Sequence, residues 1–258
     1  MNTLKEFIDG YAAPVQREVL AGLCADLRIE KLFFLTGGTA LSVFYLGHRV
    51  SEDLDLFTLD AADLPDIGFW IVRNWPNESA ALRQSPGYLS VEIKGVRVDL
   101  VVDSLSERAD RGRVVFESGR SVAVDTIGNI ASNKLATLVS RIEPKDFIDF
   151  YFIRRTYPEM RLGDIFEEAR RKEAVFDDPP TAAFQLEEGF ERLKDAMEKR
   201  TGAAPGETKE KKGTPGREAE MTLFPRMLKT VDWDDFRMFC QDLAVWLYRV
   251  NKGSGLNI

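Results

Sequence analysis

Two aspartates, Asp53 and Asp55, are the residues of this sequence best suited to metal chemistry. They lie in the run SEDLDLF (residues 51–57), whose alternating apolar residues predict a β-strand. Because side chains on a strand alternate between its two faces, both carboxylates point to the same face. Two like charges held side by side repel each other, and a divalent cation bound between them offsets that cost. The spacing therefore predicts a cation clamp.

A glycine pair, Gly37 and Gly38, precedes these aspartates. Residues 31–35 (KLFFL) before the pair predict a buried strand, and the residues after it predict a short apolar helix. Glycines let the backbone approach a ligand closely, and the first N–H groups of a helix suit phosphate. A DxD motif or a glycine pair alone is common on solvent-exposed turns. Their order, between apolar strands, indicates a nucleotide held through a divalent metal.

The runs TGGTAL, GHR and SEDLDLF closely resemble the nucleotidyltransferase AbiEii/AbiGii toxin family, within the DNA polymerase β-like nucleotidyltransferase superfamily. The superfamily pattern is a glycine pair with Ser or Thr, followed on the next strand by an acid-x-Asp motif. The resemblance implies an α+β fold, in which helices flank a mixed, largely antiparallel sheet and a mainly helical C-terminal region follows. It also implies that the protein transfers a nucleoside monophosphate from a nucleoside triphosphate to an acceptor and releases pyrophosphate.

Asp99 is an acid within an otherwise apolar run, YLSVEIKGVRVDLVV (residues 88–102). Two β-rich segments of this run meet at Lys94-Gly95, which predicts a tight hairpin. In the superfamily a third carboxylate from a neighbouring strand completes the metal site, and Asp99 fits that position. A buried acid without such a partner would be costly. The alternative is an ion pair between Arg97 and Asp99 on the exposed face of an edge strand.

The resemblance implies a role for each of these residues. Three carboxylates would bind Mg²⁺, with two ions expected and Mn²⁺ as an alternative: Asp53, Asp55 and Asp99. The glycine-rich turn would hold the β- and γ-phosphates through backbone N–H groups and a hydroxyl: Gly37, Gly38 and Thr39. Arg49 lies in a His-Arg-x-Ser segment typical of the family and would contact the nucleotide. We favour this contact over a catalytic role for His48.

A second block, NKLATLVSRIEPKDFIDFYFI (residues 133–153), also resembles the family. Members carry a helix with Lys and a later Arg, followed by Arg-Asp-x-x-Asp-Leu/Phe-Tyr. The resemblance implies that Lys134 and Arg141 bind the nucleotide and that Asp146 is a structural or active-site acid. Lys145 stands where the family usually has Arg, which keeps the charge but loses the bidentate fork. The alternative is a surface helix whose salt bridges contribute little.

The 258 residues suffice for one large domain or two modest ones. We expect a nucleotidyltransferase domain over residues 1–155 and a helical region over 156–258. Within the latter, residues 201–219 are rich in Gly, Pro and Lys, bury too little to offset their ordering entropy, and are expected to form a mobile loop. Apolar spacing and capping residues predict several helices, among them one over 127–142, capped by Asp125 or Thr126, one from Pro144, and one over 233–250.

The net charge of −7 argues against a general nucleic-acid coat protein, because non-specific affinity comes from neutralising phosphates. A local basic cleft is still compatible with this negative net charge. No run approaches the ~20 apolar residues of a membrane span, and the N-terminus does not read as a secretory signal. Cys24 and Cys240 lack metal-site spacing and are expected to be buried thiols in a reducing compartment. We therefore expect a cytoplasmic protein.

The resemblance further implies a toxin of a bacterial toxin–antitoxin or abortive-infection system, with a separately encoded antitoxin as its partner. Some relatives add nucleotides to the 3′ end of tRNA, so a nucleoside triphosphate and tRNA are the expected substrates. One alternative is a nucleotidyltransferase that modifies a small molecule, such as an aminoglycoside, or a protein side chain. Another alternative is a non-enzymatic module that senses nucleotide. The presence of the three acids and the glycine pair argues against it.

Overall fold

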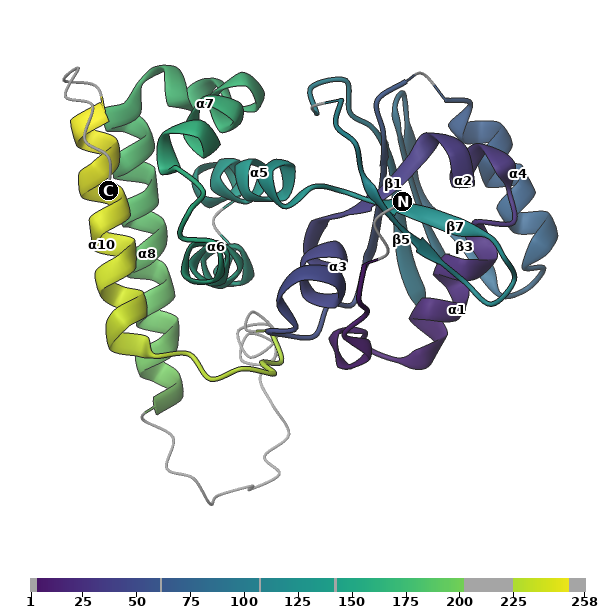
Figure 1. Cartoon of the computed structure of the whole chain (residues 1–258), viewed down its shortest axis with the longest axis horizontal. Helices are drawn as coiled ribbons and strands as arrows, with labels where there is room; N and C mark the ends of the chain where they lie inside the picture. Colours follow the sequence, from purple (N-terminus) through teal and green to yellow (C-terminus); the bar gives the residue numbers. More distant parts are fainter. Residues whose placement is uncertain (1–3, 61, 107, 142, 202–224, 251–258) are drawn as a thin grey trace. The chain divides into compact units, whose positions relative to one another are not determined.

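A computed structural model of the protein describes residues 4–60, 62–106, 108–141, 143–201 and 225–250 (Figure 1). The chain divides into two compact units, Met1–Ile130 with Met227–Lys229 and Ala131–Arg226 with Thr230–Ile258. This division falls earlier than residue 155, and the extent of the nucleotidyltransferase domain stays a prediction. Apart from its first residue, the loop expected over residues 201–219 lies outside the described residues.

The first unit contains a seven-stranded sheet among its described residues, in the order β3-β4-β5-β2-β1-β7-β6. The strands are β1 (Phe33–Thr36), β2 (Leu54–Thr58), β3 (Ser79–Ser85), β4 (Tyr88–Ile93), β5 (Val96–Val102), β6 (Gly112–Val115) and β7 (Ser121–Val124). Two neighbouring pairs are parallel, β1 with β7 and β2 with β5, and the other pairs are antiparallel. The expected mixed, largely antiparallel sheet is confirmed.

The hairpin between β4 and β5 forms at Lys94-Gly95, as predicted. Lys94 has φ 51° and Gly95 has φ 77°, the two consecutive positive values of a type I′ turn. Edge strand β3 was not predicted, because its sequence SAALRQS has no apolar alternation and nearly all of it is exposed. The strand expected over residues 31–35 begins later, at Phe33, because Lys31 and Leu32 end a helix.

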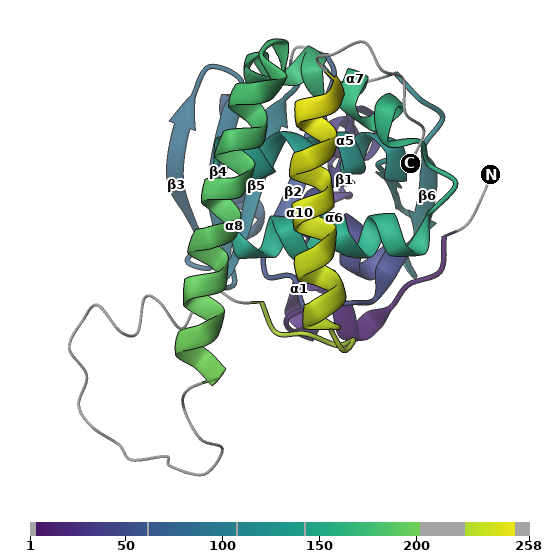
Figure 2. The same cartoon turned by 90° about the vertical axis from the view of Figure 1, so that its left-hand side faces the viewer.

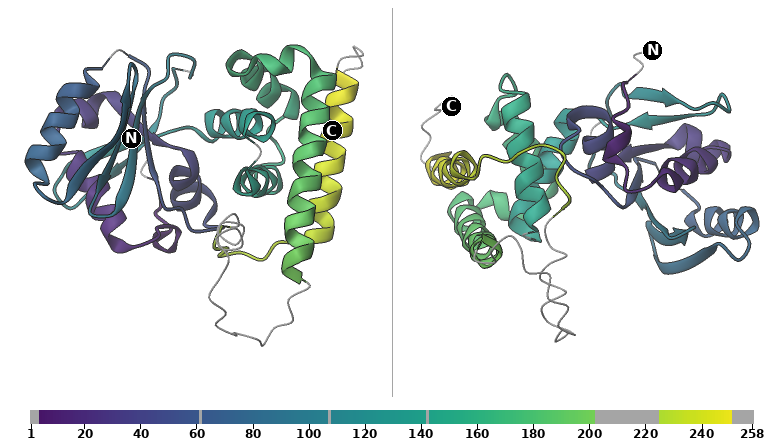
Figure 3. Two further views of the ribbon diagram at one scale, coloured as in Figure 1. Left: turned by 180° about the vertical axis from the view of Figure 1, so that it is seen from behind. Right: turned by 90° about the horizontal axis from the view of Figure 1, so that it is seen from below.

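The helices of the first unit include α1 (Pro14–Leu23), α2 (Leu27–Leu32), α3 (Gly37–Leu41), the π-helix η2 (Ser42–Leu46) and α4 (Leu64–Asn74). Helix α2 starts where the side chain of Asp26 accepts a hydrogen bond from the Arg28 amide. Helices α1, α2 and α4 cover one face of the sheet (Figures 1 and 3). Completely buried leucines on the strands, such as Leu35 and Leu56, form the core. Residues adjacent to these leucines project to the opposite face.

The second unit is helical. Its helices include the greater part of α5 (Ile127–Ser140), together with α6 (Pro144–Thr156), α7 (Leu162–Lys172), η3 (Ala174–Asp177), α8 (Pro179–Thr201) and α10 (Trp233–Val250). Helices α8 and α10 pack side by side (Figure 2). Helix α5 begins after Thr126, whose Oγ1 accepts a hydrogen bond from the Asn129 amide. The capped start of α5, the start of α6 at its proline and the full range of α10 are confirmed.

A short segment, Met227–Lys229, belongs to the first unit although α10 follows it in the second. Met227 forms an antiparallel bridge with Arg49. The amides of Leu228 and Lys229 donate to the His48 carbonyl at 2.8 and 3.0 Å. The backbone of His48 and Arg49 is therefore paired with a segment that comes much later in the sequence.

Candidate active site

Three polar residues lie in one row across the sheet because of the strand registers. Thr36 pairs with Asp55 across β1 and β2, and Asp55 pairs with Asp99 across β2 and β5. Directly paired residues project to the same face. Asp53 lies one residue before β2 rather than within it, as had been expected. The structure thus places Asp55 and Asp99 on neighbouring strands, at the face opposite the core leucines.

The glycine turn packs directly against Asp55. Gly37 has φ 67°, a backbone conformation that L-residues rarely adopt, and a Cβ atom at this position would overlap Asp55 Oδ2. Only glycine satisfies both constraints. The backbone at Gly37 therefore lies directly against the carboxylate of the DxD motif, and its close approach to a ligand stays a prediction.

Gly38 faces a cation. A Cβ atom at Gly38 would lie 2.6 Å from Arg49 Nη2 and 2.8 Å from Ser51 Oγ. Arg49 is buried, and its Nη1 donates to the Val50 carbonyl at 2.9 Å. The Gly37–Gly38 turn therefore has a carboxylate beside its first residue and a guanidinium beside its second.

Thr39 links the helix after the turn to the residue before β2. Its hydroxyl donates to the backbone carbonyl of Asp53 at 2.5 Å. Gln16 Nε2 donates to Thr39 Oγ1 at 3.3 Å and to the same Asp53 carbonyl at 3.2 Å. Sequence reasoning missed Gln16, although it shares the buried stripe of α1 with Val19, and a polar residue on an apolar stripe is a detectable signal.

Asp99 makes the ion pair that had been considered as the alternative. Arg97 Nη2 lies 3.0 Å from Asp99 Oδ2, and Ser90 Oγ donates to Asp99 Oδ1 at 2.5 Å. The Asp99 side chain is only 14% exposed, whereas that of Arg97 is 50% exposed. The pair does not lie on an edge strand, because β5 is hydrogen-bonded to both β4 and β2. Asp99 therefore combines an ion pair with a position beside Asp55.

The carboxylates offer the hard oxygen ligands that Mg²⁺ and Mn²⁺ prefer. Asp55 and Asp99 fit such a cation, since strand register places them next to each other. Among the described residues, no group of three or more His, Cys, Asp or Glu side chains is arranged to hold a metal ion. The three-acid site that includes Asp53 stays a prediction.

A buried charge network in the second unit contains the other predicted residues. Lys134 Nζ lies 2.7 Å from Asp146 Oδ1 and 2.6 Å from Asp149 Oδ2, and both acids are completely buried. Arg141 Nε lies 2.8 Å from Asp146 Oδ2. Burial alone would raise the pKa of Asp146, but the charges of Lys134 and Arg141 outweigh it and lower the pKa.

The alternative of a surface helix with weak salt bridges is wrong, because the central lysine of the network and both acids are buried. Asp146 and Asp149 share one face of α6, because residues three apart on a helix are neighbours. Lys145 lies outside the network and pairs with Glu143 at 2.9 Å on the surface. The second unit therefore brings Lys134 and Arg141 together with Asp146.

The family model described as nucleotidyl transferase AbiEii toxin, type IV TA system, matches residues 19–237. The chain belongs to the AbiEii family. The match includes all the residues predicted for the site, from the glycine pair to Asp146. This AbiEii member is therefore a nucleotidyltransferase of a toxin family, and the family identified from the motifs is confirmed.

Solved structures with a similar fold include JHP933 from Helicobacter pylori, at 16% identity and a TM-score of 0.47, covering 93% of this chain and 94% of that one. The nucleotidyltransferase toxin MenT4 from Mycobacterium tuberculosis is 12% identical, with a TM-score of 0.41 and 90% and 82% coverage. The antibiotic-resistance factor ANT(2″)-Ia is 16% identical, with a TM-score of 0.35 and 74% and 95% coverage. No curated protein matches this AbiEii chain.

In the part of the chain that the structure describes, no helix has the length and apolar character to cross a membrane.

Proposed function

We propose that this protein transfers a nucleoside monophosphate from a metal-bound nucleoside triphosphate to the 3′ end of tRNA, as a toxin acting in the cytoplasm. The observation that supports the nucleotide site is the contact of the Gly37 backbone with Asp55, itself paired with Asp99. This arrangement supports a phosphate-binding backbone beside carboxylate oxygens that would bind a cation.

Asp55 and Asp99, with Asp53, would hold Mg²⁺ or Mn²⁺. The bound metal would supply charge at the phosphate oxygens and favour ionisation of the acceptor hydroxyl. Asp99 is paired with Arg97, so a bound cation would compete with the guanidinium for this carboxylate. Arg97 is half exposed and, once released, is free to pair with an anionic phosphate.

The Gly37–Gly38 turn would hold the β- and γ-phosphates, with the Arg49 guanidinium beside Gly38 contributing positive charge. Thr39 would contribute mainly through its backbone, because its hydroxyl already donates to the Asp53 carbonyl. That bond fixes the start of β2 and hence the position of the DxD motif.

Lys134 and Arg141 are further proposed phosphate ligands, and Asp146 is a proposed catalytic carboxylate. The Lys134 ammonium contacts two carboxylates, so binding phosphate requires it to give up part of this pairing. The charges of Lys134 and Arg141 lower the pKa of Asp146, which favours the carboxylate form that holds these two cations in place and makes it a weak proton acceptor.

The tRNA acceptor and the antitoxin partner rest on the AbiEii family, whose description places it in type IV toxin–antitoxin systems. A small molecule or a protein side chain is the alternative acceptor. These acceptors need different recognition surfaces, so a direct comparison decides between them.

The test mixes the protein and Mg²⁺ with each α-labelled nucleoside triphosphate and with separate tRNA, aminoglycoside and protein pools. Label on tRNA with one triphosphate is expected, and Asp55→Asn should abolish it. Asp60→Asn is the matched control, because Asp60 follows the same strand but pairs with Arg108 at the surface. Label only on another pool, or undiminished labelling by Asp55→Asn, would overturn the corresponding part of the proposal.

A further inference from the structure

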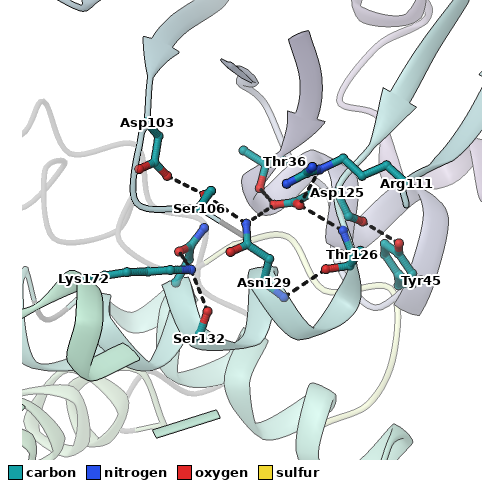
Figure 4. Close-up of polar contacts among 11 residues, drawn as sticks. Thr36, Tyr45, Asp103, Ser106, Arg111, Asp125, Thr126, Asn129, Ser132 and Lys172 are labelled. Carbon is teal, nitrogen blue, oxygen red and sulfur yellow. Dashed lines mark hydrogen bonds and ion pairs between the residues drawn. The ribbon is translucent and has the colours of Figure 1, made fainter. Parts of the chain in front are cut away.

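Asp125, a completely buried acid next to the candidate site, has no part in the function proposed above. It directly follows β7, and its carboxylate accepts hydrogen bonds from three side chains (Figure 4). Thr36 Oγ1 donates to Oδ2 at 2.7 Å, Asn129 Nδ2 donates to Oδ2 at 2.6 Å, and Arg111 Nε donates to Oδ1 at 3.0 Å. A buried polar group with this many partners fixes the elements from which the partners come.

The backbone of Asp125 extends this connection. Its carbonyl accepts a hydrogen bond from Tyr45 Oη at 2.5 Å, and its amide donates to the Leu35 carbonyl at 2.8 Å. Thr36 immediately precedes the glycine pair, and Tyr45 lies in η2, after α3. Asp125 therefore contacts the chain on both sides of the segment that contains the Gly37–Gly38 turn.

Arg111 compensates the buried charge of Asp125. Its side chain is 9% exposed, and its guanidinium carbon lies 3.7 Å from the centroid of the Phe34 ring. The arginine thus has a carboxylate and an aromatic face as neighbours, which suits its planar cation. The pair explains how an acidic side chain is accommodated at this depth.

Thr36 connects this cluster to the candidate site. Its side chain bonds to Asp125, its strand position is opposite Asp55, and the next residue, Gly37, packs against the Asp55 carboxylate. We propose that Asp125 is a positioning residue for nucleotidyl transfer, which fixes the Gly37–Gly38 turn against Asp55 through Thr36 and Tyr45. The inference rests on the proposed function, because it takes this turn to be the triphosphate-binding surface.

The test uses Thr36→Val, which removes one hydroxyl and keeps the β-branched shape. With one hydrogen bond lost, we expect the KM for the triphosphate to rise about 5-fold, while the KM for the acceptor stays unchanged. Thr36→Ser restores the hydroxyl and should restore the triphosphate KM. Thr58→Val is the matched control: Thr58 is equally buried, on the neighbouring strand, and pairs with Phe33 at the other end of β1.

Equilibrium binding of Mg²⁺-triphosphate separates this inference from the acceptor assignment. If tRNA is not the acceptor, Thr36→Val should still weaken triphosphate binding about 5-fold relative to Thr58→Val. Unchanged affinity in Thr36→Val, equal weakening in both valine variants, or failure of Thr36→Ser to recover would each overturn the positioning role. Thermal unfolding of all three variants identifies a general loss of stability.

Discussion

The buried position of Lys134 predicts a large and pH-dependent effect of Lys134→Met. This change keeps an unbranched chain of similar length and removes an ammonium that lies within 2.7 Å of Asp146 and Asp149. Removing one partner from a buried ion pair costs roughly 3–5 kcal/mol, because the remaining charge is left in a poorly solvating environment. We expect a loss of about 3 kcal/mol, at the lower end of that range, since Arg141 still contacts Asp146.

The pH dependence of the variant should be opposite to that of the wild type. In the wild type, the pKa of Asp146 is lower in the folded than in the unfolded protein. The stabilising contribution of Asp146 is therefore complete above its pKa in the unfolded protein, about 3.9. It is lost as the pH falls through its lower pKa in the folded protein. In Lys134→Met, buried carboxylates without the ammonium have raised pKa values, so stability should increase as pH falls from about 8 to about 5.

Amide hydrogen exchange is the appropriate assay, because it reports on α6 and on the β4–β5 hairpin separately. Exchange in α6 should accelerate in Lys134→Met, and exchange in the hairpin should not. Lys145→Met is the matched control, with an expected cost below about 1 kcal/mol, because Lys145 pairs with Glu143 at the surface. The reasoning is refuted if both variants lose the same stability, or if Lys134→Met becomes less stable between about pH 8 and about pH 5.

Three further variants test the candidate site of the first unit. Gly37→Ala should lower the rate of nucleotidyl transfer by at least about 100-fold, because its Cβ displaces Asp55. Gly95→Ala is the control and should leave the rate unchanged, because Gly95 also has a positive φ but its Cβ would meet nothing within 4 Å. Arg97→Gln should tighten Mn²⁺ binding, measured by electron paramagnetic resonance, because it removes the competitor for Asp99; weaker binding would contradict this competition. Gln16→Leu should lower the transfer rate about 5-fold, because it removes the bonds from Gln16 to Thr39 and to the Asp53 carbonyl. An unchanged rate would show that these two bonds do not position the DxD motif.

The features that sequence predicted well depend on short stretches of chain. The Lys94-Gly95 turn is local because two residues set its backbone angles, and the same holds for the Thr126 cap of α5. The glycine pair was informative because its conformation and its close contact exclude other residues. Such features need no knowledge of the sheet order.

The parts that sequence did not predict depend on pairing between distant segments. Asp99 was recognised as a candidate, but its alignment with Asp55 follows from the parallel pairing of β2 with β5. The bond of the Thr39 hydroxyl to the Asp53 carbonyl likewise needs the spatial arrangement of α3 and β2. Asp125 was considered only as a helix cap, because no local pattern indicates that Thr36 and Arg111 converge on it.

The pairing of Met227–Lys229 with His48–Arg49 has a consequence during protein synthesis. The nascent chain carries Arg49 early, but the backbone bonds from Leu228 and Lys229 to the His48 carbonyl can form only after residue 229 has left the ribosome. Until then the His48–Arg49 segment beside Gly38 lacks these backbone hydrogen bonds. For the toxin proposed above, this order of assembly would delay completion of the active protein until most of the chain has been translated.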